Sequence, residues 1–486
     1  MSKEILALNP TSLWKNFYDL TQIPRPSKHE SQVKDFIVSF GKRLGLETIV
    51  DDTGNVIIRK PATHGMENRK GVILQGHLDM VPQKNTGIAH DFEKDPIDAY
   101  IDGEWVKAKD TTLGGDNGMG IAATMCILES KDLKHGPVEA LFTIDEETGM
   151  TGAFGLKKDL LNGSILLNLD SEDEGELYIG CAGGTNANIL FRYKEVSVPA
   201  GMEAFRISLT GLKGGHSGVD IHLGRGNSNK IATRILWEAS QSCGLRLSGF
   251  DGGSLRNAIP REAFLDVVVH ASRSSALKKL VSDIESIIKK ELSAVETGIT
   301  IEMKATTLPS FLIDETFQKH LIHALYACPN GVMRMSNDMP GLVETSNNMA
   351  LVKTSKNEIK VQCLLRSSVD SAKIDLEHMI QSVFEMAGAN IIFDGQYPGW
   401  KPNPDSAILK TMLKIYENLY GRTPEIKAIH AGLECGILGG TYPHWDMISF
   451  GPTIRFPHSP DEKVNILSVQ KFWDFLVATL EQIPNR

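Results

Sequence analysis

Residues 72–79 read VILQGHLD, an apolar run that closes on Gly76-His77-Leu78-Asp79. A run of this length and composition predicts a buried strand. Side chains alternate along a strand, so His77 and Asp79 should leave it on the same side. An imidazole and a carboxylate placed together could bind a metal ion and orient it. Since His-x-Asp also arises by chance, the pair matters because similar strand ends recur along the chain.

Three further strand-like runs end in acidic residues or histidine. They are Val138 to Asp145 before Glu146-Glu147, Ser164 to Leu169 before Asp170, and Met447 to Phe450 shortly before Pro457-His458. Helical patterns at about 117–130 and 151–160 separate the early strands, which predicts an α/β layer with a mixed, largely parallel sheet. Such sheets bind ligands at the carboxyl ends of their strands. Upstream, residues 12–45 read as two helices, with Ser27 as the cap of the second.

The pattern of strand-like and helical runs changes in the middle third of the sequence. Strand-like and helical runs mix there until a linker rich in glycine and proline leads back, which predicts a second, α+β domain. His458 follows that linker but belongs with the early strand ends, so we expect the middle domain to be an insertion. The predicted division is 1–186 together with 400–486 as a discontinuous catalytic domain, and 187–399 as an inserted lid domain.

The composition is that of an ordinary globular protein. The 486 residues suffice for two domains, and 23% are charged and 41% hydrophobic. A net charge of −9 with acids and bases interspersed argues against a general nucleic-acid binder. No signal peptide or membrane-spanning run is visible, so no membrane partner is expected. The six cysteines include no CxxC pair, which predicts reduced thiols in a cytoplasmic protein.

Five residues at these positions are candidate metal ligands. They are His77, Asp116, Glu147, Asp170 and His458. With Asp116 bridging from its glycine-rich turn, each of two divalent ions would have three protein ligands. One ion would be held by His77, Asp116 and Asp170, and the other by Asp116, Glu147 and His458. Imidazole and carboxylate together suit zinc, with manganese or cobalt also possible. Two ions about 3.5–4 Å apart can activate one water and polarise the bond that it attacks.

Two more acidic residues flank these ligands. Asp79 could accept the second ring N–H of His77 and hold the imidazole. Glu146 should diverge from Glu147 and suits the general base, which moves a proton from water to the leaving amine. The residues alone leave two interpretations open. One is a dinuclear metal site, and the other is a set of solvated surface acids with ordinary core and surface histidines.

Taken in order, the motifs resemble those of the dinuclear zinc peptidases of the aminoacylase and carboxypeptidase-G2 superfamily. The motifs are Gly76 to Pro82, Gly114 to Gly118, Asp145 to Gly149, Asn168 to Glu172 and Pro457 to Asp461. Residues 61–70 and 178–184 resemble its aminoacyl-histidine dipeptidase branch, and the resemblance extends over essentially the whole chain. It implies the zinc-peptidase fold, two Zn²⁺ per subunit, and small dipeptide substrates, preferentially Xaa-His dipeptides including carnosine.

The resemblance also implies roles for individual residues. It makes the five candidates metal ligands, with Asp116 bridging, and gives Asp79 and Glu146 catalytic roles. An aspartate at Asp170 accompanies aminopeptidases and dipeptidases in this superfamily, whereas a glutamate accompanies carboxypeptidases and deacylases. The position of Asp170 therefore points to the dipeptidase branch.

Four further residues resemble substrate-binding positions. His216, in Gly214-Gly215-His216, is similar to the lid histidine that helps to polarise the scissile carbonyl, within its own subunit or across a dimer interface. Asn257 and Arg366 resemble lid residues that hold the substrate, and a bidentate arginine suits a carboxylate. Glu434 could anchor the free ammonium. The resemblance further implies a homodimer formed through the lid domain.

Three alternative functions remain open. A tripeptidase and an N-acyl amino acid deacylase would share the fold and the metal site. A noncatalytic metal- or peptide-binding protein would keep the ligands but would have no need of Glu146.

Overall fold

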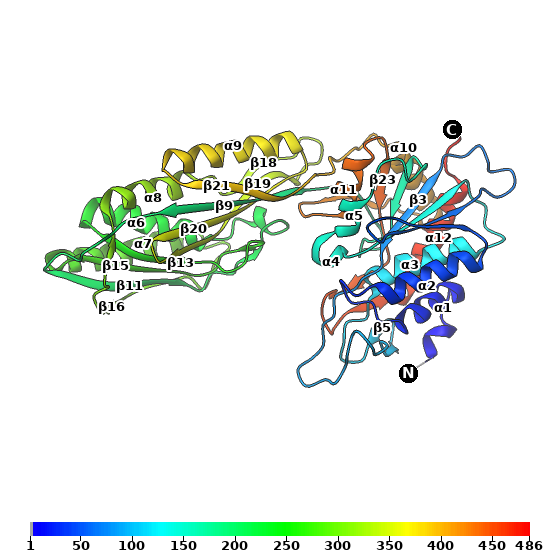
Figure 1. Cartoon of the computed structure of the whole chain (residues 1–486), viewed down its shortest axis with the longest axis horizontal. Helices are drawn as coiled ribbons and strands as arrows, with labels where there is room; N and C mark the ends of the chain where they lie inside the picture. Colours follow the sequence, from blue (N-terminus) through cyan, green and yellow to red (C-terminus); the bar gives the residue numbers. More distant parts are fainter. Residues whose placement is uncertain (1–2) are drawn as a thin grey trace. The chain divides into compact units, whose positions relative to one another are not determined.

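The computed structural model describes residues 3–486 and divides the chain into two compact units (Figure 1). The first unit contains the residues up to Cys181, Pro402–Ala428 and Leu433–Arg486. The second contains Ala182–Lys401 and the short segment Ile429–Gly432. The first unit is therefore discontinuous in sequence, and four residues of the returning chain belong to the second unit.

An eight-stranded mixed sheet forms the centre of the first unit, as the sequence predicts. Its strands, in spatial order, are β1 (Glu47–Val50), β2 (Val56–Lys60), β6 (Val138–Thr143), β3 (Val72–His77), β7 (Ile165–Asn168), β23 (Asp446–Ser449), β8 (Glu176–Cys181) and β22 (Glu425–Ile429). The four central strands, from β6 to β23, run parallel, whereas β1, β2 and β8 pair antiparallel. The carboxyl ends of the central strands consequently meet at one edge.

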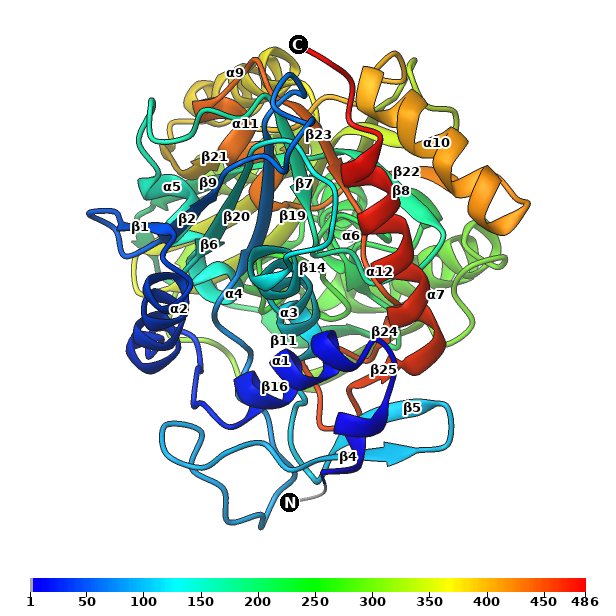
Figure 2. The same cartoon turned by 90° about the vertical axis from the view of Figure 1, so that its right-hand side faces the viewer.

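The central strands are buried on both faces, which explains their continuous apolar runs. Every residue of β3 and of β6 is buried. The helices of this unit are α1 (Thr11–Thr21), α2 (Ser31–Arg43), α3 (Gly115–Glu129), α4 (Glu146–Gly149), α5 (Thr151–Gly155), α10 (Ala407–Tyr420), α11 (Glu434–Thr441) and α12 (Ile466–Glu481). Helix α3 packs on β3 and is covered by α1 (Figure 2), so it is apolar on all sides and begins at the strand edge.

Two details of the predicted helices are wrong. Helix α2 begins at Ser31 and not after Ser27, whose hydroxyl instead donates a hydrogen bond to Asp79. The helix expected over 151–160 ends at Gly155, because Leu156 is extended and Asp159 has a positive φ of 67°.

A four-stranded sheet that the sequence did not predict also belongs to the first unit. Its order is β24 (Ile454–Arg455), β25 (Lys463–Asn465), β5 (Trp105–Ala108) and β4 (Ala99–Asp102). Strands β24 and β25 pair antiparallel, and the loop between them carries His458. This small sheet fixes both ends of that loop.

The second unit is built on a nine-stranded antiparallel sheet. Its strands are β16 (Thr300–Thr306), β11 (Met202–Thr210), β15 (Ala263–His270), β13 (Arg246–Gly252), β19 (Val343–Ser355), β20 (Glu358–Ser367), β9 (Gly183–Arg192) and β21 (Asn390–Tyr397), with β18 (Gly331–Met335) paired to β19. Strand β9 alternates buried and partly exposed residues, which is typical of a sheet covered on one face.

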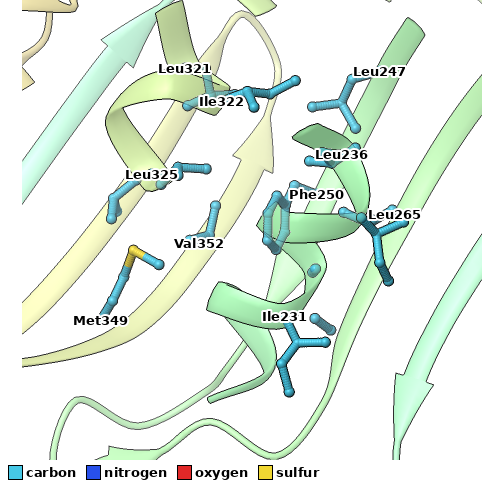
Figure 3. Packing of buried hydrophobic residues seen from close by; sticks show 14 of the residues in the cluster. Ile231, Leu236, Leu247, Phe250, Leu265, Leu321, Ile322, Leu325, Met349 and Val352 are labelled. Atoms are coloured by element: carbon cyan, nitrogen blue, oxygen red, sulfur yellow. The ribbon is translucent and has the colours of Figure 1, made fainter. Parts of the chain in front are cut away.

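Four helices cover this sheet and close one hydrophobic core. They are α6 (Ser228–Cys243), α7 (Ser274–Glu291), α8 (Glu315–Ala327) and α9 (Asp370–Met386). Figure 3 shows the core around Phe250, where α6 and α8 meet the strands. The remaining short elements are η1 (Glu4–Ala7), β10 (Glu195–Val196), β12 (Gly215–His216), η2 (Ile221–Leu223), β14 (Ala258–Ile259), η3 (Ala271–Arg273) and β17 (Leu312–Ile313). None of the helices between residues 3 and 486 combines the length and apolar character that a bilayer span requires.

Candidate active site

The five candidate metal ligands come together at the carboxyl ends of the central strands of the first unit. His77 Nε2 lies 3.0 Å from Asp116 Oδ1 and 3.2 Å from Asp170 Oδ1. His458 Nε2 lies 3.4 Å from Asp116 Oδ2 and 2.9 Å from Glu147 Oε2. The ligands therefore form two groups of three, and each carboxylate oxygen of Asp116 faces a different group.

The donor atoms of this cluster fit divalent cations. Asp170 Oδ1 and Glu147 Oε1 are buried and accept no hydrogen bond from the described residues. Burial raises the pKa of Asp170 to about 7, and the nearby carboxylates of Asp116 and Glu147 add to that rise while His77 opposes it. Two imidazoles and three carboxylates are a ligand set that zinc, manganese and cobalt accept. Cations at these positions would offset the repulsion between the carboxylates.

Asp79 holds the parts of this cluster together. Its Oδ1 accepts a hydrogen bond from the main-chain N–H of Glu146 at 3.0 Å, and its Oδ2 accepts those of Glu147 N–H at 3.2 Å and the Ser27 hydroxyl at 2.8 Å. Oδ1 also lies 3.4 Å from His77 Nδ1. Burial raises the pKa of Asp79, but the interaction with His77 and the hydrogen bonds from the main chain and Ser27 outweigh it and lower that pKa to about 2. The carboxylate is thus positioned to orient both the His77 ring and the start of α4.

Glu146 begins α4 directly beside the candidate ligand Glu147. A ligand atom of Glu146, one of His77 and one of Glu147 all lie within 4.8 Å of one another. Burial raises the pKa of Glu146 well above its usual value, and the charges of Asp170 and Glu434 raise it further. A carboxyl group with a raised pKa is suited to taking up and releasing a proton.

Glu434 is a buried member of the same charge cluster. Its Oε2 accepts hydrogen bonds from Gln75 Nε2 at 2.6 Å and from Thr143 Oγ1 at 2.8 Å. Its Oε1 has no hydrogen-bond donor among the described residues. Burial raises the pKa of Glu434 to about 7. One carboxylate oxygen therefore remains available to a further donor.

The other three predicted substrate-binding residues lie in the second unit. His216 Nδ1 accepts hydrogen bonds from the main-chain N–H groups of Gly218 and Val219, at 3.2 and 3.1 Å. Burial lowers the pKa of His216, and the charge of Arg366 lowers it further. A neutral imidazole with its Nδ1 occupied as an acceptor carries its proton on Nε2. His216 can therefore donate one hydrogen bond from Nε2.

Asn257 and Arg366 lie close to this histidine loop. The main-chain carbonyl of Asn257 accepts a hydrogen bond from Ser217 N–H at 2.8 Å. Arg366 is 5% exposed, its Nη1 lies 3.0 Å from the Tyr397 hydroxyl, and its Nε has no acceptor among the described residues. A buried guanidinium with a free N–H can bind an anion.

The sequence interpretation overlooked several residues around these sites. His430, in the short segment of the second unit, lies with its Nε2 2.7 Å from the Ser346 hydroxyl. Ser346 is the cross-strand partner of Arg366. In the first unit, Arg25 and Glu462 bind the loop that carries Asp116. No local sequence pattern marked these residues, because single charged residues are usually exposed.

Comparison with known proteins shows that the chain is a peptidase and identifies its family. The chain belongs to Peptidase family M20/M25/M40, whose sequence model matches residues 73–482.

Two relatives are similar over the full length. The cytosol non-specific dipeptidase of Escherichia coli (strain K12) is 47% identical over 481 residues, which cover 99% of each protein. The crystal structure of aminoacylhistidine dipeptidase from Vibrio alginolyticus has a TM-score of 0.96 and 53% identity, covering 100% of this chain and 99% of that one. Aminopeptidase PepT from Bacillus cereus, at 17% identity, a TM-score of 0.58 and coverage of 98% and 99%, shares the fold.

Proposed function

We propose that this protein is a metal-dependent dipeptidase that prefers Xaa-His dipeptides, including carnosine. The observation that carries the proposal is the placement of Asp116, with one oxygen facing His77 and the other facing His458. Glu146 lies beside that double site. Two relatives that match over the full length, a non-specific dipeptidase and an aminoacylhistidine dipeptidase, support the substrate class.

The proposed cofactor is two Zn²⁺ per subunit, with Mn²⁺ or Co²⁺ as replacements. One ion would be held by His77, Asp116 and Asp170, and the other by Asp116, Glu147 and His458. When bound, the ions supply the Lewis acidity that polarises a peptide carbonyl and lowers the pKa of water. Asp79 keeps the His77 ring in place through Nδ1 and leaves Nε2 for the metal.

Glu146 performs the proton transfers in this proposal. Its carboxylate takes a proton from the attacking water and delivers it to the nitrogen of the leaving amino acid. His216 donates its Nε2 hydrogen to the developing oxyanion of the carbonyl, from its own subunit or from its partner. Glu434 suits the substrate's ammonium and Arg366 suits its carboxylate, the two charges that every dipeptide carries.

The same proposal assigns roles to the two units and a location to the protein. The first unit would be the catalytic domain, and the second, close to the predicted 187–399, would be the lid through which a homodimer forms. Similarity to the cytosol non-specific dipeptidase of Escherichia coli supports a cytosolic location.

Metal analysis combined with a hydrolysis panel tests the proposed function. The panel contains Xaa-His dipeptides including carnosine, other dipeptides, tripeptides and N-acyl amino acids. We expect about two metal ions per chain and the highest kcat/KM on dipeptides. Preference for tripeptides or N-acyl amino acids would indicate one of the other hydrolases, and metal without turnover would indicate a binding protein.

Glu146→Gln tests the mechanism separately. The variant keeps the shape of the side chain but cannot accept a proton, so we expect kcat to fall by about 10²–10⁴-fold with the metal content unchanged. Glu93→Gln, which changes an exposed glutamate, is the matched control and should retain full activity. Turnover of Glu146→Gln close to that of the unmodified protein would remove Glu146 from the mechanism.

A further inference from the structure

The loop that carries Asp116 is bound by a single buried carboxylate. Glu462 Oε2 accepts the main-chain N–H groups of Leu113 at 2.7 Å and Gly114 at 3.0 Å. Its Oε1 accepts those of Gly115 at 2.8 Å and Asp116 at 3.3 Å. Four consecutive N–H groups therefore converge on one side chain that is 2% exposed. The last of these groups belongs to the residue that both metal groups share.

A buried guanidinium group also binds this loop, through a main-chain carbonyl oxygen of the loop. Arg25, 2% exposed, donates from Nη2 to the Gly114 carbonyl. From Nη1 it donates to the carbonyls of Leu78 at 3.0 Å and Asp79 at 2.9 Å. One guanidinium therefore joins the end of β3, which carries His77, to the loop that carries Asp116. Both main-chain polar groups of Gly114 are taken by ionisable side chains.

The glycines of this loop leave the space that the two side chains occupy. A Cβ added at Gly114 would lie 2.6 Å from Arg25 Nη2, and one added at Gly118 would lie 2.8 Å from the same atom. A Cβ at Gly115 would lie 3.2 Å from Glu462 Oε1 and 2.5 Å from a methyl group of Val464. The glycine-rich motif is thus shaped to the arginine and the glutamate that hold it.

A purely structural role explains this arrangement poorly. Burying an arginine and a glutamate is costly, and apolar packing often stabilises a protein at least as well. Ionised groups instead impose a fixed geometry, because a guanidinium fork and a carboxylate each fix several hydrogen bonds at once. The geometry that they fix here is that of His77 relative to Asp116, whose facing atoms lie 3.0 Å apart.

We propose that Arg25 and Glu462 are positioning residues for the metal centre. Arg25 sets the end of β3 against the 113–116 loop, and Glu462 sets the main chain of Asp116, so that the two carboxylate oxygens of Asp116 face two cations. This inference rests on the metal binding proposed above. Residues that hold metal ligands in place typically change metal affinity by about 10–100-fold when they are substituted.

Cobalt titration of the metal-free, full-length protein tests the inference. The variants are Glu462→Gln, which can no longer accept four N–H groups, and Arg25→Lys, which keeps the charge but loses the planar fork. Affinity is measured by competition with a chelator, and the visible absorption of bound Co²⁺ reports its coordination. We expect both variants to bind Co²⁺ on the order of 10–100-fold more weakly, with an altered spectrum.

Glu139→Gln is the matched control, because Glu139 is a similar carboxylate away from the metal groups. It is 6% exposed, pairs with Arg59 and accepts the N–H groups of Asn162 at 2.7 Å and Gly163 at 2.8 Å. It lies at the opposite end of β6 from the strand end that leads to Glu146. Its substitution should lower the unfolding temperature of the metal-free protein and leave Co²⁺ affinity and spectrum unchanged.

The outcomes separate this inference from the proposed function. If the unmodified protein binds no Co²⁺, the metal function itself fails. If it binds Co²⁺ and both variants bind equally well with the same spectrum, or if Glu139→Gln weakens binding as much, the positioning role is refuted. Glu462→Asp keeps the charge and shortens the side chain by one methylene, so it serves if Glu462→Gln does not fold. It should also weaken Co²⁺ binding, though less, and unchanged binding would again refute the role.

Discussion

His430 should make the protein sensitive to acid, and the size of the effect follows from its surroundings. The side chain is 5% exposed, and its Nε2 lies 2.7 Å from the Ser346 hydroxyl. Burial lowers the pKa of His430 from 6.5 to about 3, and the positive charge of Arg366 contributes to the decrease. The folded protein therefore keeps this imidazole neutral at a pH where the unfolded chain protonates it.

The sign and magnitude follow from this difference in pKa. Above about pH 6.5 neither state binds the proton, so the stability is fully present. As the pH falls from 6.5 toward 3, the unfolded state alone takes up the proton and the free energy of unfolding decreases. At pH 5, about 1.5 units below the unfolded pKa, the loss is about 2 kcal/mol, because each unit is worth about 1.4 kcal/mol. Any folded pKa below about 4 gives nearly the same value.

Urea unfolding of the chelator-treated His430→Gln variant at about pH 8 and pH 5 measures this pH-dependent loss of unfolding free energy. The substitution removes the Ser346 hydrogen bond at both pH values, so it should destabilise the protein at pH 8. At pH 5 that cost should be smaller by about 2 kcal/mol, because glutamine does not titrate. Ser346→Ala loses the same hydrogen bond but keeps the histidine, so its cost should not change with pH in this way. An equal cost of His430→Gln at both pH values would refute the reasoning.

Three further predictions concern the hydrophobic core of the second unit, substrate binding and the glycine-rich segment that carries Asp116. Phe250→Ala should lower the free energy of unfolding by about 3–5 kcal/mol in urea denaturation, because the ring is buried among the side chains of Figure 3. Arg366→Lys should raise KM for dipeptides with little change in kcat, and dipeptide amides should show a much smaller difference in steady-state kinetics. Gly118→Ala should cost about 1–3 kcal/mol by the same urea assay, since its Cβ would lie 2.8 Å from Arg25 Nη2 and 2.9 Å from the Phe17 ring.

The fold could be predicted where local pattern and tertiary packing agree. Strands β3, β6 and β7 are buried apolar runs, and their spacing by helices indicated the parallel centre of the sheet. The small sheet of β4, β5, β24 and β25 escaped prediction, because its strands have two to four residues and partly exposed side chains. Strands this short are defined by their partners, and β25 pairs with β5 across more than three hundred residues.

The candidate site could be predicted to a similar degree. His77, Glu147 and Asp170 follow recognisable strands, so the topology alone brings them to one edge. The residue pattern grouped His458 with Asp116 and Glu147 although both are distant in sequence, and His458 Nε2 lies 3.4 Å from Asp116 Oδ2 and 2.9 Å from Glu147 Oε2. Arg25, Glu462 and His430 were missed because no local pattern distinguishes a buried charged or neutral polar side chain from an exposed one. Only the fold shows that Glu462 meets Leu113, 349 positions away.

The packing around Asp116 explains why its sequence motif is rich in glycine. Arg25 leaves no room for a side chain at Gly114. The side-chain amide of Asn117 has the same effect at Gly76 and Gly120, because an added Cβ would lie 2.2 Å and 2.5 Å, respectively, from its Oδ1. None of these glycines could bind a metal through a side chain. Their restriction comes from the packing that holds Asp116, at the start of α3, beside the end of β3. The motif is rich in glycine because the side chains that hold the segment around Asp116 in place leave no room for a Cβ there.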